Sequence, residues 1–166
     1  MAIKTLNDLF IEELRDIYHA ERQLVRALPK LSRAASTPEL KQAIDHHLQE
    51  TKGQVERLDQ VFETLDTRAR GRPCQAMQGL IEEAQEMLDE HMAGELLDVA
   101  IIVNAQKVEH YEIAGYGSLI ALAKGLGHQD AIRLLEQTLA EEKGADQKLT
   151  KLADTLVNQK ALQNAG

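Results

Sequence analysis

The sequence has few of the residues that mark secreted or membrane proteins. It contains one cysteine, no tryptophan, three tyrosines and two phenylalanines. The lone thiol, Cys74, cannot form an internal disulfide, and the chain has neither the continuous apolar run of a membrane span nor that of a signal peptide. We therefore expect a cytoplasmic protein that has no contact with a membrane.

Excess positive charge is also missing. Asp and Glu number 27 against 19 Lys and Arg, which leaves a formal net charge of -8. The basic residues are scattered along the sequence, so no single stretch of it would attract phosphate backbones or anionic lipid. These features predict that nucleic acid is not a partner.

What the sequence does contain favours helices. Ala, Leu, Glu, Gln and Lys are abundant, and all five are good helix formers. A chain of 166 residues has the length of one domain with one hydrophobic core. The prediction is a single all-α domain over residues 1–166.

Apolar residues recur at steps of three and four, which predicts two helices in the first half of the chain. The first spans about residues 6–35, with Asn7 as its cap and Pro29 either kinking it or separating its last turn. The second spans about 38–65 and starts at Thr37 and Pro38, a favoured cap and first-turn pair. Together they form a hairpin over about 6–65.

The second half repeats this arrangement after a long connection. A crossover over about 66–94 carries a short amphipathic helix near 75–89, and the second hairpin, about 95–160, has helices over about 95–125 and 129–160. Two hairpins joined by one long crossover form the ferritin-like four-helix bundle. An extended coiled coil is excluded because Pro38, Gly71, Pro73 and Gly127 divide the pattern into short pieces.

Most acidic residues fall on polar faces, but a few interrupt the apolar stripes. Each long helix carries one or two metal-competent side chains near its middle, on the face that should be buried: Glu21, His47 with Glu50, Glu109 with Glu112, and Glu142. Antiparallel packing would bring these positions to one level of the bundle. We expect five carboxylates and one imidazole to converge.

Buried like charges are costly unless they take up protons or bind cations, and no Lys or Arg is predicted on these stripes. One such glutamate could be a core acid satisfied by a hydroxyl or backbone group, but six positions on four helices indicate a metal site. Carboxylates with one imidazole suit iron, manganese or zinc. We predict two metal ions, with iron the first choice and manganese or zinc the alternatives.

The segments that carry these residues resemble the bacterial YciF and YciE proteins, and YciF more closely. The similarity covers nearly the whole chain and includes RDIYHAERQL, HHLQETKGQVERLDQV, AQKVEHYEIAGYGSL and LAEEKGADQKL. It implies a ferritin-like, rubrerythrin-like fold, a homodimer and a role in stress responses. The wider rubrerythrin-like pattern also has two histidines, at positions where this sequence has Gly53 and Ala145.

Three further residues lie one turn from proposed ligands. Tyr18 and Tyr116 could hydrogen-bond the ligands or relay an electron, although filling the core is the alternative for both. Asp146 could orient His47 as a hydrogen-bond acceptor or be exposed to solvent. Cys74 lacks a neighbouring base in the sequence, so we do not expect it to be a nucleophile.

The leading hypothesis is a dimetal protein, of oxidase or peroxidase type if it is an enzyme, that reacts with oxygen or peroxide or handles metal under stress. It would need an external electron donor, since the chain has no rubredoxin-like cysteine cluster. The alternative is a non-catalytic helical scaffold whose acidic core is vestigial or sets the register of a dimer. Iron storage is a third hypothesis, and it would require a closed shell of many subunits.

Overall fold

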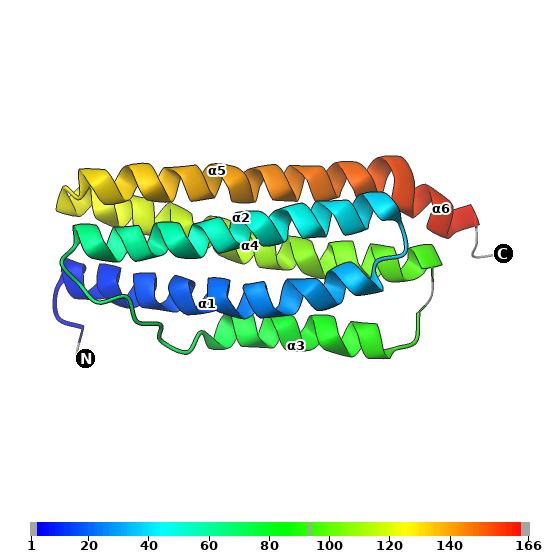
Figure 1. The fold of residues 1–166 in the computed structure, drawn as a ribbon, viewed down its shortest axis with the longest axis horizontal. Coiled ribbons are helices and arrows are strands. Elements are labelled where there is room, and N and C mark those ends of the chain that lie inside the picture. Colours follow the sequence, from blue (N-terminus) through cyan, green and yellow to red (C-terminus); the bar gives the residue numbers. More distant parts are fainter. Residues whose placement is uncertain (1–2, 93, 164–166) are drawn as a thin grey trace.

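The computed structural model describes residues 3–92 and 94–163, so the ends of the predicted 1–166 unit lie outside the described part. Four long helices run side by side in antiparallel order (Figure 1). They are α1 (Leu6–Ala34), α2 (Pro38–Thr64), α4 (Gly94–Leu126) and α5 (Gln129–Leu152). The four close a square in which α1 packs on α2 and α4, while α5 packs on α2 and α4.

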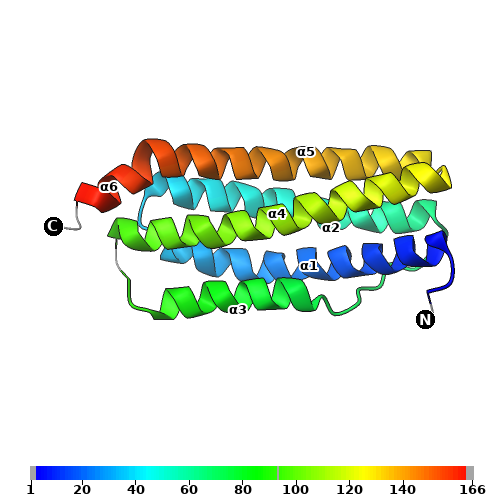
Figure 2. The same ribbon diagram turned by 180° about the vertical axis from the view of Figure 1, so that it is seen from behind.

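A fifth helix, α3 (Gln75–Asp89), lies in the crossover between the hairpins. It runs along the outside of the bundle against α1 and α4, as the view from behind also shows (Figure 2). The predicted fold class is therefore confirmed: the chain is an all-α, ferritin-like four-helix bundle whose one long crossover contains a short helix. None of the described helices is long and apolar enough to cross a membrane.

Helix α1 begins at Leu6, as predicted, but its capping residue differs from the prediction by two positions. Its cap is Thr5, whose hydroxyl accepts a hydrogen bond from the Asp8 backbone N–H, while the Asp8 carboxylate accepts one from the Thr5 N–H. This reciprocal capping box satisfies two backbone donors, the N–H groups of Thr5 and Asp8. Pro29 does not divide the helix, because α1 continues through it to Ala34.

The turn between α1 and α2 is held by a residue that the sequence analysis did not single out. Thr37 and Pro38 begin α2 as predicted, but the Thr37 side chain makes no capping hydrogen bond. Instead, the fully buried carboxylate of Asp98, on α4, accepts hydrogen bonds from the backbone N–H groups of Ser36 and Thr37 at 2.7 and 2.8 Å. One helix of the second hairpin thus supplies the cap for the first hairpin.

The last predicted helix is not uniform. After α5 the backbone widens into a π-helical segment, Ala153–Val157, and continues as α6 (Asn158–Gln163). Val157 is fully buried, so the wider turn brings an apolar side chain into the core that a regular helix would orient differently. The prediction of one continuous helix over about 129–160 was too simple here.

Candidate metal centre

Three helices bring four metal-competent side chains to one point in the middle of the bundle. His47 comes from α2, Glu109 and Glu112 from adjacent turns of α4, and Glu142 from α5. All four are buried, and one ligand atom from each lies within 4.8 Å of the others. The sequence predicted all four, because each interrupts an apolar stripe.

His47 is the contact point between the helices. Its Nε2 lies 3.2 Å from Glu109 Oε1 and 3.9 Å from Glu142 Oε2. Its Nδ1 lies 3.5 Å from Glu50 Oε2, at the outer side of the ring. One imidazole therefore faces carboxylates from all three helices of the cluster.

Most polar atoms of the four residues have no hydrogen-bond partner among the described residues. These atoms are both carboxylate oxygens of Glu112 and of Glu142, one oxygen of Glu109 and both ring nitrogens of His47. Buried polar groups in folded proteins are almost always paired, so a group of this many unpaired atoms is unusual. Carboxylate oxygens and imidazole nitrogen are the donor atoms that iron, manganese and zinc bind, and the set fits such an ion.

The electrostatics agree with this fit. Burial raises the pKa of Glu112 well above its usual range, and the charges of Glu21 and Glu142 raise it further. Burial, followed by the adjacent Glu142, likewise raises the pKa of Glu109. In the metal-free protein these carboxyl groups are held toward the protonated form, whereas a cation would favour the charged form.

Glu21, from α1, is fully buried beside the cluster but has a hydrogen-bond partner of its own. The hydroxyl of Tyr116 donates to Glu21 Oε1, and Glu21 Oε2 has no partner among the described residues. Burial and the charge of Glu142 raise the pKa of Glu21, while the Tyr116 hydrogen bond opposes them. Tyr116 thus combines the two roles considered for it, because it is fully buried and contacts a proposed ligand.

Glu50, like Glu21, is a predicted ligand that lies outside the central group, and it is the one that is partly exposed. Its side chain is 26% exposed, and its Oε2 lies 3.3 Å from Nδ1 of His46, the more exposed of the two histidines. The neighbouring His47 and then His46 lower the pKa of Glu50, against the effect of burial. Glu50 flanks His47 on its outer side, where a charged carboxylate is partly solvated.

Asp146 and Tyr18 contact residues other than the proposed ligands. Asp146 accepts a hydrogen bond from Gln106 at 3.1 Å and lies 3.3 Å from His110 Nε2. Tyr18 is buried and packs edge-to-face on Phe62, with ring centroids 5.6 Å apart, so it fills the core, which was the alternative role considered for it. Helical spacing puts a residue on a given face, but the partner that its side chain contacts depends on what lies nearby.

Among the described residues, no Lys or Arg is buried on the stripes of the four long helices, as expected, but one arginine lies close beside them. Arg57, seven residues after Glu50 on α2, is mostly buried and forms a bidentate pair with Glu141 at 2.9 and 3.0 Å. Arg57 also donates to Thr138, and Gln54 donates to Glu141. The seven-residue step was the signal that could have revealed it. The positive charge of Arg57 is therefore paired with Glu141, the residue next to Glu142, and not with a carboxylate of the cluster.

A pocket of about 180 Å³ leads from the surface to the cluster. His47, Glu50 and Glu109 line it together with small residues, among them Gly144 and Ala145. Ala145 stands where the rubrerythrin-like pattern has a histidine, so the smaller side chain leaves space next to His47. The acidic cluster is therefore buried but reachable by a small molecule.

Comparison with known proteins places the chain in a family. Residues 5–162 match the family described as a domain of unknown function, DUF892. The chain belongs to the DUF892 family. The protein YciF of Escherichia coli K12 is 52% identical over 166 residues, which cover 99% of this chain and all of YciF. The resemblance to YciF that the sequence indicated is confirmed.

Solved structures of similar proteins have the same fold. The crystal structure of the E. coli stress protein YciF superposes with a TM-score of 0.91 at 52% identity, covering 94% of this chain and 99% of that one. YcfI from Rhodopseudomonas palustris, described as a candidate structural protein, gives 0.88 at 51% identity, covering 89% and 94%. A protein from Xanthomonas campestris gives 0.72 at 19% identity, covering 96% and 98%, and shows the fold alone.

Proposed function

We propose that the protein binds transition-metal ions, iron first, at the buried cluster and serves in stress defence through oxygen or peroxide chemistry or metal handling. One observation carries the proposal: His47, Glu109, Glu112 and Glu142 offer ligand atoms within 4.8 Å of one another, and most of these atoms have no partner among the described residues. The relationship to YciF, described as a stress protein, supports the physiological role.

Each residue has a definable task in this proposal. Glu109, Glu112 and Glu142 would supply carboxylate oxygens, and His47 the one nitrogen. Glu21 would complete the shell of a second ion, with its orientation set by the Tyr116 hydroxyl, and Glu50 would join from the solvent side by a change of rotamer. A bound iron would supply electron exchange with oxygen or peroxide, manganese and zinc being the alternative occupants.

The pocket and the partners complete the proposal. Small oxidants would reach the cluster through the opening beside Gly144 and Ala145, which is wide enough for them and lined mainly by apolar side chains. Electrons would come from an external donor, because Cys74 is the only cysteine. The homodimer and the cytoplasmic location remain predictions.

The first experiment is elemental analysis of protein purified without chelator, with oxygen uptake measured after anaerobic loading with ferrous iron. About two iron ions per chain with rapid oxygen consumption is the expected result. One ion per chain would restrict the site to the four central residues. Absence of bound metal under both conditions would refute the proposal.

A scaffold function is the second candidate, and two observations on this chain favour it. Glu50 lies between His46 and the outer side of His47 and is not one of the four central residues, and Gly53 and Ala145 replace two ligands of the rubrerythrin-like pattern. The description of YcfI as a candidate structural protein points the same way. A scaffold would unfold at the same temperature with and without metal, whereas a metal protein would be stabilised by it.

A further inference from the structure

A second concave site lies about α1 and the loop that leads to α3, and its chemistry is opposite to that of the metal centre. Arg22 and Arg26, one turn apart on α1, line it together with Arg68 and Arg70 of the loop. We name it the arginine groove. Its volume is about 440 Å³, within the usual range of small-molecule sites.

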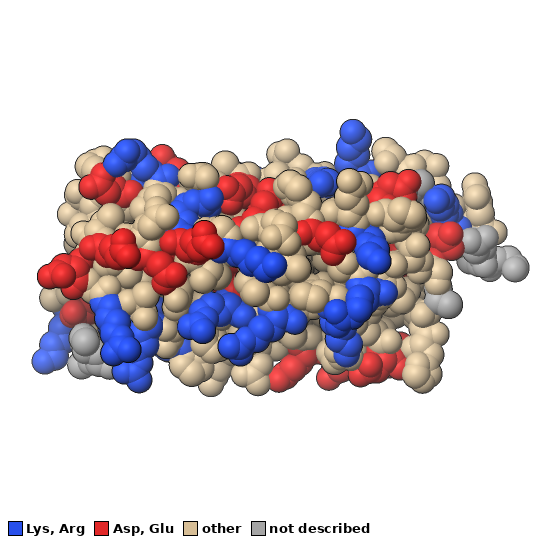
Figure 3. Space-filling model, in the orientation of Figure 1, with Lys and Arg blue, Asp and Glu red and all other residues tan. Residues whose placement is uncertain are grey.

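The four guanidinium groups form no ion pairs among the described residues. None of the described residues that line the groove is acidic. The protein carries a net charge of -8, so acidic residues are abundant elsewhere. Figure 3 shows Lys and Arg gathered along α1 and the loop, below a band of acidic side chains along α2.

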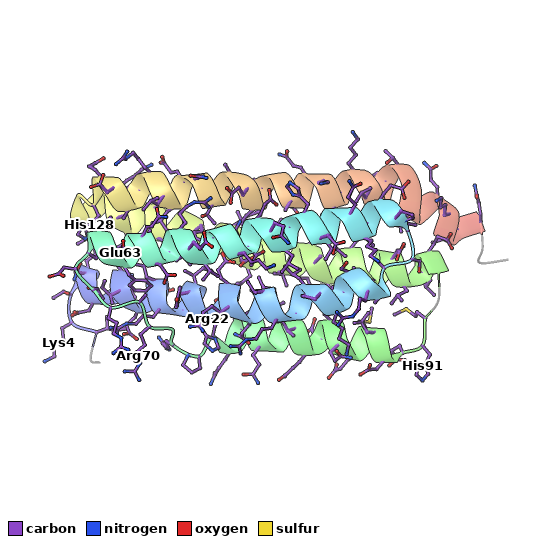
Figure 4. The ribbon with its side chains drawn as sticks, viewed as in Figure 1. Lys4, Arg22, Glu63, Arg70, His91 and His128 are labelled. Carbon is purple, nitrogen blue, oxygen red and sulfur yellow. The ribbon has the colours of Figure 1, made fainter. Side chains whose placement is uncertain are left out.

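The loop that carries two of the arginines is fixed to α1. The backbone N–H of Arg72 donates to the carbonyl of Arg15 at 3.0 Å. Gly71 packs so closely on His19 that an added Cβ would lie 3.1 Å from the His19 Cβ. Arg22 and Arg70 consequently lie on one side of the molecule, from two different segments (Figure 4).

The polar residues at the base of the groove are held as well. Nδ1 of His19 accepts a hydrogen bond from the Cys74 backbone N–H at 3.1 Å, and Gln23 donates to the Cys74 carbonyl at 3.1 Å. With Nδ1 engaged as an acceptor, the neutral His19 ring carries its proton on Nε2. The Arg22 guanidinium is placed over the Tyr18 ring, 5.6 Å from its centroid.

Grouped arginines repel one another, and no ion pair among the described residues offsets that repulsion. Guanidinium groups match the geometry of phosphate oxygens and bind them in bidentate fashion. Guanidinium groups from both α1 and the loop would surround a ligand that carries several anionic groups. We propose that the arginine groove binds a small molecule that carries two or more phosphate groups.

The proposal is tested by calorimetric titration of the full-length protein with inorganic tripolyphosphate at low salt. Saturable one-to-one binding is expected, at least roughly fivefold tighter than citrate binding, because each phosphate engages a guanidinium pair. The double variant R22Q/R70Q should bind at least roughly tenfold more weakly. R22K/R70K should be intermediate, since lysine keeps the charge but loses the fork.

Two controls separate this site from other sources of binding. Arg133→Gln removes an exposed arginine of α5 that pairs with Asp130, and it should change the affinity less than about twofold. Glu112→Gln removes a predicted metal ligand, so unchanged binding in that variant shows that tripolyphosphate does not act through bound metal. Phosphate binding in the arginine groove would then be established independently of the metal proposal.

Several results would overturn the proposal. The first is absence of saturable binding at millimolar tripolyphosphate. The second is an equal loss of tripolyphosphate affinity in R133Q and R22Q/R70Q, and the third is loss of tripolyphosphate binding in E112Q. Citrate binding of equal strength would also overturn it, because the groove would then recognise charge alone. An oligonucleotide that competes more than roughly tenfold better than tripolyphosphate would assign the groove to nucleic acid instead.

Discussion

Replacing Glu112 by glutamine should stabilise the metal-free protein. Glu112 is fully buried and neither of its oxygens has a partner among the described residues. A glutamate in the unfolded chain ionises near pH 4.5. Burial raises the pKa of Glu112 well above this value, so a carboxyl group that stays protonated in the fold costs roughly 1.4 kcal/mol for each pH unit above it. Glutamine has nearly the same shape and avoids this cost.

Part of that gain is lost to the new amide, whose N–H groups need acceptors. Oxygen atoms of Glu109 and Glu142 lie within 4.8 Å of a Glu112 oxygen, so the side chains would have to move closer to accept these hydrogen bonds. We expect a net stabilisation of about 2 kcal/mol, which for a protein of this size corresponds to about 6 °C in Tm. Zinc or manganese at about one hundred times its Kd should stabilise the wild type by about 3 kcal/mol and the variant far less.

Urea unfolding of both proteins, with chelator and then with added zinc or manganese, measures these differences. The order of stability should invert: E112Q is the more stable protein with chelator, and the wild type with metal. Glu56→Gln, at an exposed position of α2, is the matched control and should stay within about 0.5 kcal/mol in both conditions. The reasoning would be refuted if E112Q were less stable than the wild type in chelator, or if metal stabilised E112Q and the wild type equally.

Three further outcomes are expected. His47→Ala should weaken zinc or ferrous binding roughly a hundredfold in equilibrium dialysis, and unchanged affinity would exclude His47 as a ligand. Tyr116→Phe should lower the free energy of unfolding in urea by about 1 to 2 kcal/mol through loss of its hydrogen bond to Glu21. In the presence of chelator, the pKa values of Glu21, Glu109 and Glu112 are raised in the fold. Their protonation contributes its full stabilisation below about pH 4.5, and this stabilisation is lost as the pH rises through the raised pKa values. Urea titrations from pH 5 to 8 should therefore show falling stability, and a rise would contradict this.

The sequence predicted the bundle because apolar residues recur at helical spacing along its helices and the breaks between them are marked by proline and glycine. It also predicted the central metal-competent residues, since a glutamate such as Glu112 in an apolar stripe is costly unless a proton or a cation neutralises it. Periodicity determines which face of a helix a residue occupies. Burial of Glu21, His47, Glu109 and Glu142 follows from that face alone.

Face assignments do not determine which neighbour a side chain contacts, and there the predictions were less accurate. Glu50 lies on the expected face but turns to His46, and Asp146 pairs with Gln106 and His110. Arg57 was missed because it lies seven residues beyond Glu50, beyond the steps of three and four that were considered. Competition between nearby partners selects each contact, and many of those partners come from other helices.

The sequence by itself determined the helices, their buried faces and the identity of the central ligand candidates, because these depend on local periodicity and on the cost of burying charge. Only the tertiary structure decided which charges gather on the surface. Arg22 and Arg26 are far in sequence from Arg68 and Arg70, and the composition indicated scattered positive charge. The loop against α1 unites them, since side chains from distant segments share a site only once the chain has folded.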